Sequence, residues 1–280
     1  MEEISHRTAV QIIEQRGTNS VPFLVLCDDG ELYIAKTIFQ KHPPYNDLIN
    51  EILGKYGLNL FGVKTIPACI LKIPQEVFDD FKTGGKEYDT RYDKLVLDKT
   101  FFFGSLMRDT TVELEQFNFN LKNKFEYKKY DAPLTFIKIG IFDYWLSNMD
   151  RRIKNPNILI NQNEAGLFEF LPIDHTQLFA NQTSYKNLKI ALMNTPPRGT
   201  ILDSPISRNI LRFTDSEKLY NFHKEILSGF EVVLDNLDYI FDQVPGEFGL
   251  SKKAKLKIRE ILSDDERNKR ISKVYHTFAK

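Results

Sequence analysis

The stretch Phe142–Ile160 reads FDYWLSNMDRRIKNPNILI, and the prediction of the fold starts from it. Its apolar first part leads to Asp150, two arginines follow, and Asn155 and Asn157 come just before a run of Ile, Leu and Ile. A run of branched apolar residues after a polar turn is typical of a β-strand. The stretch therefore predicts that one carboxylate and two amides lie where a loop enters a strand.

A second apolar run follows after a loop of Asn, Gln and Gly, and it delivers Asp174. Asp150 and Asn155 lie five positions apart (155 − 150 = 5). This offset separates the proton-accepting Asp from the magnesium-binding Asn in a kinase catalytic loop. We predict Asp150 as the catalytic carboxylate, with Asn155 and Asp174 as oxygen ligands of Mg²⁺. The alternative is that Asp and Asn gather here because turns between strands favour them.

The segments NMDRRIKNPNILI and PIDH resemble the Asn-x-Asp-Arg-x-x-x-Asn and Ile-Asp-His signatures of HipA-like kinases. These kinases form the bacterial branch of the protein-kinase-like fold, which also includes the lipid kinases. Arg152 departs from the pattern, since many relatives carry His there. Asn157 competes with Asn155 for the metal, and Asn155 is preferred because its spacing matches.

The resemblance covers most of the chain and implies an α+β, two-lobed protein-kinase-like fold. It also implies ATP and Mg²⁺ as cofactors and Ser or Thr of a protein as the phosphoryl acceptor. An antitoxin-like protein is a candidate partner. We place the β-rich N-lobe at residues 1–105 and the mainly helical C-lobe at residues 106–280.

A loop rich in small residues lies between the first two predicted strands, 8–14 and 23–26. Such a loop lets backbone N–H groups approach phosphates, and a kinase places its glycine-rich loop at this point. An ordinary hairpin loop is the equal alternative. The candidate phosphate-binding residues are Gly17, Thr18, Asn19 and Ser20.

Lys36 lies in the predicted strand 32–39, where alternation puts it on the same face as Leu32 and Ile34. A cation on an apolar face needs a partner, because burying an unpaired charge is costly. The Ala-Lys pair matches the kinase lysine that contacts the α- and β-phosphates. The alternative is a lysine on an exposed strand edge.

Residues 46–56 have the apolar spacing of a helix, which Gly54 or Gly57 is expected to end. Glu51 lies in the middle of this helix and is the candidate ion-pair partner of Lys36. A solvent-facing helical carboxylate is the equal alternative.

Three phenylalanines precede Gly104 and Ser105, which predicts a buried strand that ends in flexible residues. HipA-like kinases have a similar Phe-Gly-Ser near the hinge that touches adenine, so the resemblance makes Phe103, Gly104 and Ser105 candidate adenine contacts. The charged stretch 78–99 reads as a loop or insertion. Helices are predicted at 134–148, 215–243 and 252–262.

Composition excludes several classes of protein. Of the 280 residues 42% are hydrophobic, and no apolar run approaches the 18 residues of a membrane span. The start of the chain lacks the pattern of a secretory signal, so we expect a cytoplasmic protein without membrane contact. The net charge of zero gives no reason to expect nucleic-acid binding. Cys27 and Cys69 lie in apolar runs and are expected to be buried free thiols.

The sequence therefore predicts an ATP-dependent kinase that acts on a hydroxyl group, with Ser or Thr of a protein as the implied acceptor. Two alternatives stay open. The catalytic loop does not encode the acceptor, so a small-molecule or lipid-type kinase of the same superfamily would look alike. Arg152 also leaves open a pseudokinase that binds nucleotide and serves as an interaction module.

Overall fold

The computed structural model describes residues 3–17, 21–39, 42–114, 121–182, 184–194 and 199–277. The chain forms two compact units, the first from residues 1–48 and 66–109 and the second from residues 49–65 and 110–280. A single boundary near Ser105 was expected. The structure differs because residues 49–65 pack with the C-terminal part of the chain.

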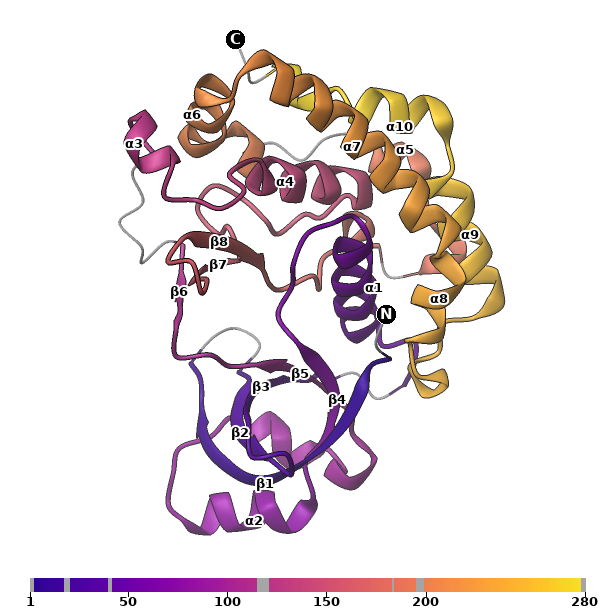
Figure 1. Ribbon diagram of the computed structural model, residues 1–280. Coiled ribbons are helices and arrows are strands. Elements are labelled where there is room, and N and C mark those ends of the chain that lie inside the picture. The colour runs from indigo at the N-terminus through magenta and orange to yellow at the C-terminus, as the bar shows by residue number, and fades with distance from the viewer. Residues whose placement is uncertain are drawn as a thin grey trace. The chain divides into compact units, whose positions relative to one another are not determined.

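The first unit is a closed five-stranded barrel, seen in the lower part of Figure 1. Around the barrel the order is β1, β2, β3, β5, β4, in which β1 pairs with β4 in parallel and all other pairs are antiparallel. The strands are β1 (Ser5–Gln15), β2 (Phe23–Cys27), β3 (Leu32–Lys36), β4 (Ala68–Lys72) and β5 (Phe102–Leu106). The predicted strands near the N-terminus and the hairpin of β2 and β3 are confirmed.

The buried face of β3 is the one opposite to Lys36. Tyr33 and Ala35 are buried, whereas Leu32, Ile34 and Lys36 are half-buried. Lys36 thus shares a face with Leu32 and Ile34, as predicted, but that face is half-buried and is not the one that packs in the core. The strand also ends at Lys36 rather than at residue 39.

Helix α2 (Gln75–Thr83) packs against β1 (Figure 1). It buries Phe78 and Phe81, whose rings meet the ring of Phe23 edge-on at centroid distances of 6.0 and 5.7 Å. The predicted loop at 78–99 was thus wrong for its first part. The helix is short and rich in exposed charged residues, so its few apolar positions did not give a recognisable helical pattern in the sequence.

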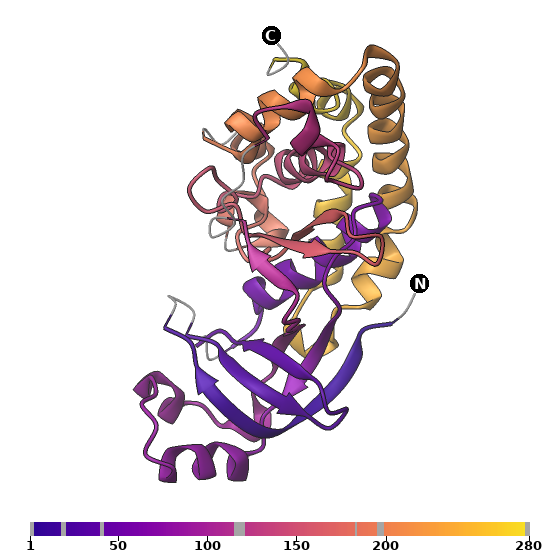
Figure 2. The same ribbon diagram turned by 60° about the vertical axis from the view of Figure 1, so that its left-hand side comes forward.

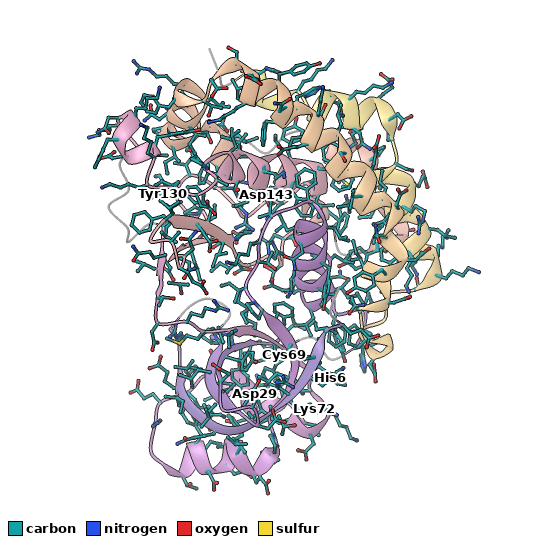
Figure 3. The ribbon with its side chains drawn as sticks, in the orientation of Figure 1. His6, Asp29, Cys69, Lys72, Tyr130 and Asp143 are labelled. Carbon is teal, nitrogen blue, oxygen red and sulfur yellow. The ribbon has the colours of Figure 1, made fainter. Side chains whose placement is uncertain are left out.

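Cys27 and Cys69 are buried free thiols, as predicted. Figure 3 labels Cys69 in the barrel, and burial raises the pKa of both thiols to about 12. A Cβ on Gly104 would come within 2.7 Å of the Cys69 sulfur. Gly104 and Ser105 therefore belong to the packed strand β5 and are not the flexible end that was expected.

Helix α1 (Asn46–Leu60) runs through both of the glycines that were expected to end it. The packing of the second unit explains them, because a Cβ on Gly54 would lie 2.5 Å from the His175 side chain and one on Gly57 would lie 2.8 Å from the Phe142 ring. Each glycine thus allows a close approach of α1 to another segment.

The centre of the second unit is α4 (Leu134–Leu146), which is buried on almost every side and confirms the predicted helix. It contacts a sheet of the order β6, β7, β8, formed by β6 (Thr111–Glu113), β7 (Ile158–Gln162) and β8 (Phe168–Pro172) (Figures 1 and 2). The strand pair β7–β8 with Asp174 after it is as predicted.

Further helices complete the second unit: α3 (Lys124–Tyr127), α5 (Ile190–Met193), α6 (Pro205–Phe213), α7 (Ser216–Asp235), α8 (Leu237–Asp242), α9 (Lys252–Leu262) and α10 (Asp265–Ile271). Short 3-10 helices lie at Thr90–Lys94, Leu97–Lys99, Phe179–Asn181, Tyr185–Asn187, Ile201–Asp203, Gly246–Phe248 and Val274–Thr277. The helix predicted at 215–243 is divided into α7 and α8, and α9 has the predicted bounds. In the part of the chain that the structure describes, no helix has the length and apolarity to cross a membrane.

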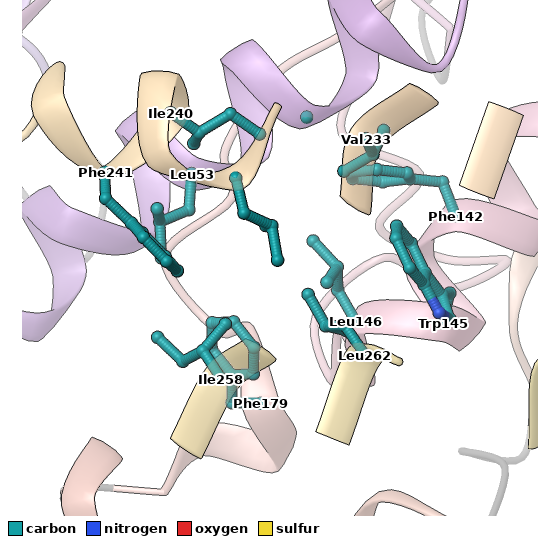
Figure 4. A pocket seen from close by; sticks show the side chains of 12 residues that line it. Leu53, Phe142, Trp145, Leu146, Phe179, Val233, Ile240, Phe241, Ile258 and Leu262 are labelled. Atoms are coloured by element: carbon teal, nitrogen blue, oxygen red, sulfur yellow. The ribbon is translucent and has the colours of Figure 1, made fainter. Parts of the chain in front are cut away.

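A small apolar pocket lies in the second unit, between α1, α4, α8 and α9 (Figure 4). Leu53 of α1, Trp145 of α4 and Ile258 of α9 are among its lining residues. The lining offers no charged group to a phosphate, so this pocket belongs to the packing of the unit and not to the candidate active site.

Candidate active site

Asp150 is positioned by the way in which α4 ends. Ser147 adopts left-handed geometry (φ 53°) and stops the helix. The side chain of Asn148 then donates to the Asp143 carboxylate at 2.9 Å and accepts the backbone N–H of Asp150 at 3.1 Å. One buried amide therefore links the helix to the loop that carries Asp150.

Asn157 lies against Asp150, since its Nδ2 donates to Asp150 Oδ2 at 2.8 Å. Asn155 lies elsewhere in the loop. Its backbone pairs with that of Arg152 through two hydrogen bonds of 2.9 and 3.1 Å, and its side chain is exposed. The structure thus brings Asn157 to the candidate catalytic carboxylate Asp150, although the sequence spacing favours Asn155. The metal role of Asn155 stays a prediction.

Asp174 and Asn157 lie at the same end of the β7–β8 hairpin. Ile158 is opposite Pro172, and the N–H of Ile173 donates to the carbonyl of Asn157 at 2.9 Å. Asp174 follows directly, in left-handed geometry (φ 57°) that Asp tolerates better than most residues. The hairpin therefore holds the Asn157 amide just before β7 and the Asp174 carboxylate just after the neighbouring strand β8.

Arg151 is fully buried and joins the parts of this site. Its Nε forms an ion pair with Asp143 at 2.7 Å, and its Nη2 lies 3.1 Å from Nδ1 of His175. Its Nη1 donates to the carbonyl oxygens of Pro156 and Asn157. Arg151 thus contacts α4, the start of β7 and the residue after Asp174.

Sequence reasoning missed Arg151 and its partner Asp143, which Figure 3 labels on α4. Burial raises the pKa of the Asp143 carboxyl, and the Arg151 guanidinium acts in the opposite direction. A carboxylate inside the predicted apolar helix was the available signal, because a buried charge needs a partner. The arginines after Asp150 were the nearest cations in the sequence.

Glu51 is buried at 2% exposure and accepts the backbone N–H of His175 at 3.0 Å. This excludes the alternative of a solvent-facing carboxylate. An ion pair between Glu51 and Lys36 stays a prediction.

The first unit gathers several of the predicted nucleotide-binding residues. In the pairing of β3 with β5, Lys36 is opposite Phe103, Ala35 opposite Gly104 and Ile34 opposite Ser105. The candidate lysine and the candidate adenine contacts therefore lie on adjacent strands. Gly17 follows the end of β1, where Arg16 N–H donates to Pro22 O at 2.9 Å. The predicted contacts Thr18, Asn19 and Ser20 lie outside the described residues.

The donor chemistry at the end of the hairpin fits a hard cation. Asn157 supplies an amide oxygen and Asp174 a carboxylate, and Mg²⁺ binds through one or two carboxylates together with phosphate oxygens and water. Over the described ranges, no group of three or more His, Cys, Asp or Glu residues could hold an ion. Phosphate oxygens of a nucleotide and water would supply the remaining ligands of a Mg²⁺ ion here.

Solved structures of kinases share this architecture. One is the crystal structure of a Helicobacter pylori proinflammatory kinase, CtkA, with a TM-score of 0.53 and 18% identity over 99% of this chain and 98% of that one. Another is the Golgi casein kinase, with a TM-score of 0.50 and 13% identity over 100% of this chain and 76% of that one. At such identities the likeness shows the fold, which is that of a kinase.

The model of the HipA-like kinase family matches residues 9–270, and the chain belongs to this family. The resemblance seen in the sequence is thereby confirmed. The predicted α+β, kinase-like fold is confirmed as well. A search among curated proteins returned no match.

Proposed function

We propose that this kinase transfers the γ-phosphoryl group of ATP to a hydroxyl group, with Ser or Thr of a protein as the acceptor. The observation that carries the proposal is the contact of 2.8 Å between Asn157 and Asp150, next to the hairpin end that presents Asp174. In protein kinases a catalytic carboxylate lies near an asparagine and a second aspartate that hold Mg²⁺, and this arrangement supports the proposal.

Asp150 would orient the acceptor hydroxyl and take its proton as the hydroxyl oxygen bonds to the γ-phosphorus and the bond from that phosphorus to ADP breaks, so that ADP leaves. The hydrogen bond that Asn157 donates holds the Asp150 carboxylate in one orientation. Asp174, with the oxygen of Asn157 or Asn155, would hold Mg²⁺, which supplies charge neutralisation at the phosphate oxygens when bound. Lys36 would contact the α- and β-phosphates, with Gly17, Thr18, Asn19 and Ser20 around the phosphates and Phe103, Gly104 and Ser105 at adenine.

The experiment is transfer of labelled phosphate from ATP by the wild type and by Asp150→Asn, which removes the charge and keeps the shape. Turnover should fall by roughly 10²- to 10⁴-fold, the usual contribution of a general base. Nucleotide affinity should stay near that of the wild type. Asp131→Asn is the matched control, because Asp131 is an exposed carboxylate in the loop before α4.

The destination of the label separates the candidate functions. Label on Ser or Thr of proteins, lost in Asp150→Asn, supports the proposal. Label only on small hydroxyl compounds or lipids would favour the other kinases of the superfamily. Nucleotide binding without turnover in the wild type would favour an interaction module.

A further inference from the structure

A chain of hydrogen bonds within the second unit ends at the carboxylate of Asp174. The Tyr185 hydroxyl donates to Asn50 Oδ1 at 2.7 Å, and Asn50 Nδ2 donates to the carbonyl of Thr176 at 2.6 Å. The Thr176 hydroxyl in turn donates to Asp174 Oδ1 at 2.9 Å. Helix α1 and Tyr185 are thereby linked through Thr176 to one candidate metal ligand.

The middle of this chain is enclosed. Asn50 is 4% exposed and Tyr185 is 3% exposed, so water cannot easily replace either partner. The amide of Asn50 has an oxygen that accepts and a nitrogen that donates, and the two contacts together fix which way it points. The Tyr185 ring is also held, since it meets the Phe179 ring edge-on at 5.7 Å.

Helix α1 makes a second contact with the same short segment, from the neighbouring residue. Glu51 accepts the N–H of His175, while Asn50 donates to the carbonyl of Thr176. Two successive residues of one helix thus hold two successive residues after Asp174. Since Asn50 and Glu51 are both buried, a shift of this segment would leave polar groups unpaired at a cost.

We propose that Thr176, Asn50 and Tyr185 are positioning residues that orient the Asp174 carboxylate for the metal. The inference rests on the proposed function, in which Asp174 is a ligand of Mg²⁺. It adds that the 3-10 helix Tyr185–Asn187, which packs against α9, helps to set the affinity for the metal.

Thr176→Val and Tyr185→Phe test this chain, because each removes one hydroxyl and little else. The measurement is the Mg²⁺ concentration for half-maximal turnover, together with calorimetric titration of Mg²⁺ in the presence of a non-hydrolysable ATP analogue. Thr176→Val should weaken Mg²⁺ binding roughly tenfold, since it loses a hydrogen bond to a charged group. Tyr185→Phe should weaken it roughly threefold, because it acts through a neutral amide.

Further readouts separate positioning from a general loss of stability. Thr176→Ser keeps the hydroxyl and should restore the Mg²⁺ dependence of the wild type. The KM for ATP at saturating Mg²⁺ should stay unchanged in all three variants. Tyr127→Phe and Thr214→Val are matched controls, because these two hydroxyls lie 3.0 Å apart elsewhere in the second unit.

Unchanged Mg²⁺ affinity in Thr176→Val and Tyr185→Phe would overturn the inference, as would an equal change in the two controls. The titration needs no turnover, so it separates this inference from the proposed function. A wild type that binds Mg²⁺ with the analogue but transfers no phosphate would refute the proposed function alone. A wild type that does not bind Mg²⁺ with the analogue would refute both.

Discussion

Asn157 donates its side-chain amide to the carboxylate of Asp150 across a distance of 2.8 Å. The left-handed backbone of Asn157 (φ 46°), which Asn adopts more readily than most residues, occurs just before β7 begins at Ile158. The amide that contacts the Asp150 carboxylate is thus seven positions beyond it (157 − 150 = 7). Between these two residues, the backbones of Arg152 and Asn155 pair in a local turn.

Replacing the two asparagines separately should therefore give unequal effects. Asn157→Ala frees the Asp150 carboxylate to rotate and removes a candidate metal oxygen, so turnover should fall by roughly tenfold or more. Asn155→Ala removes an exposed side chain and should change turnover by less than about twofold. Turnover at several Mg²⁺ concentrations is the measurement. A larger loss in Asn155→Ala, with a raised Mg²⁺ requirement, would favour Asn155 over Asn157 as the metal ligand.

Asp174→Ala should abolish the part of ATP binding that depends on Mg²⁺. Asp174 is the one carboxylate assigned to the metal, and without it the ion would depend on an amide and the phosphates. Calorimetric titration of ATP with and without Mg²⁺ measures this difference. Asp174→Asn keeps a neutral oxygen and should retain part of the effect. Wild-type affinity for Mg·ATP in Asp174→Ala would remove Asp174 from the metal site.

Gly54→Ala should destabilise the protein, although alanine in a helix interior is usually better than glycine by about 0.5–1 kcal/mol. The added methyl group would lie 2.5 Å from the His175 side chain, so α1 and the segment after Asp174 would have to separate. We expect a lower midpoint of thermal unfolding and a higher Mg²⁺ requirement. Gly246→Ala is the control, since its methyl group would meet nothing within 4 Å. Unchanged Mg²⁺ dependence in Gly54→Ala would show that this contact does not position Asp174.

Part of the fold could be predicted because several segments have a regular apolar spacing or a continuous apolar run. The strand hairpin at β2 and β3, the apolar helix α4 and the helix α9 were all read from spacing alone. Helix α2 was missed because Phe78 and Phe81 stand among charged residues in a short segment. The end of α1 was misplaced because its glycines serve close packing, which depends on partners more than 80 residues away in the chain.

The candidate site could be predicted where a sequence motif identifies its residues. It could not be predicted where tertiary packing decides which residues come into contact. Asp150 and Asp174 follow apolar runs that place them at the ends of regular elements. The contact of Asn157 depends on backbone geometry in the loop, and the buried pair of Arg151 and Asp143 depends on tertiary structure. The acceptor and an antitoxin-like partner stay predictions from the resemblance.

The ion pair of Arg151 and Asp143 should contribute strongly to the free energy of unfolding only while both partners are present. Arg151→Met leaves the Asp143 carboxylate buried without its cation, which costs about 3–5 kcal/mol. The double variant Asp143→Leu/Arg151→Met removes both charges, so its loss should be smaller than the sum of the two single losses.

Arg259→Met is the control, because the pair of Arg259 with Asp238 is largely exposed and such pairs contribute about 0–1 kcal/mol. Urea unfolding of Arg151→Met, Asp143→Leu, the double variant and Arg259→Met measures the coupling, and strictly additive losses would show that the two charges do not depend on each other. Turnover should still be low in the double variant, because the carbonyl of Asn157 and the ring of His175 lose the guanidinium that contacts them both.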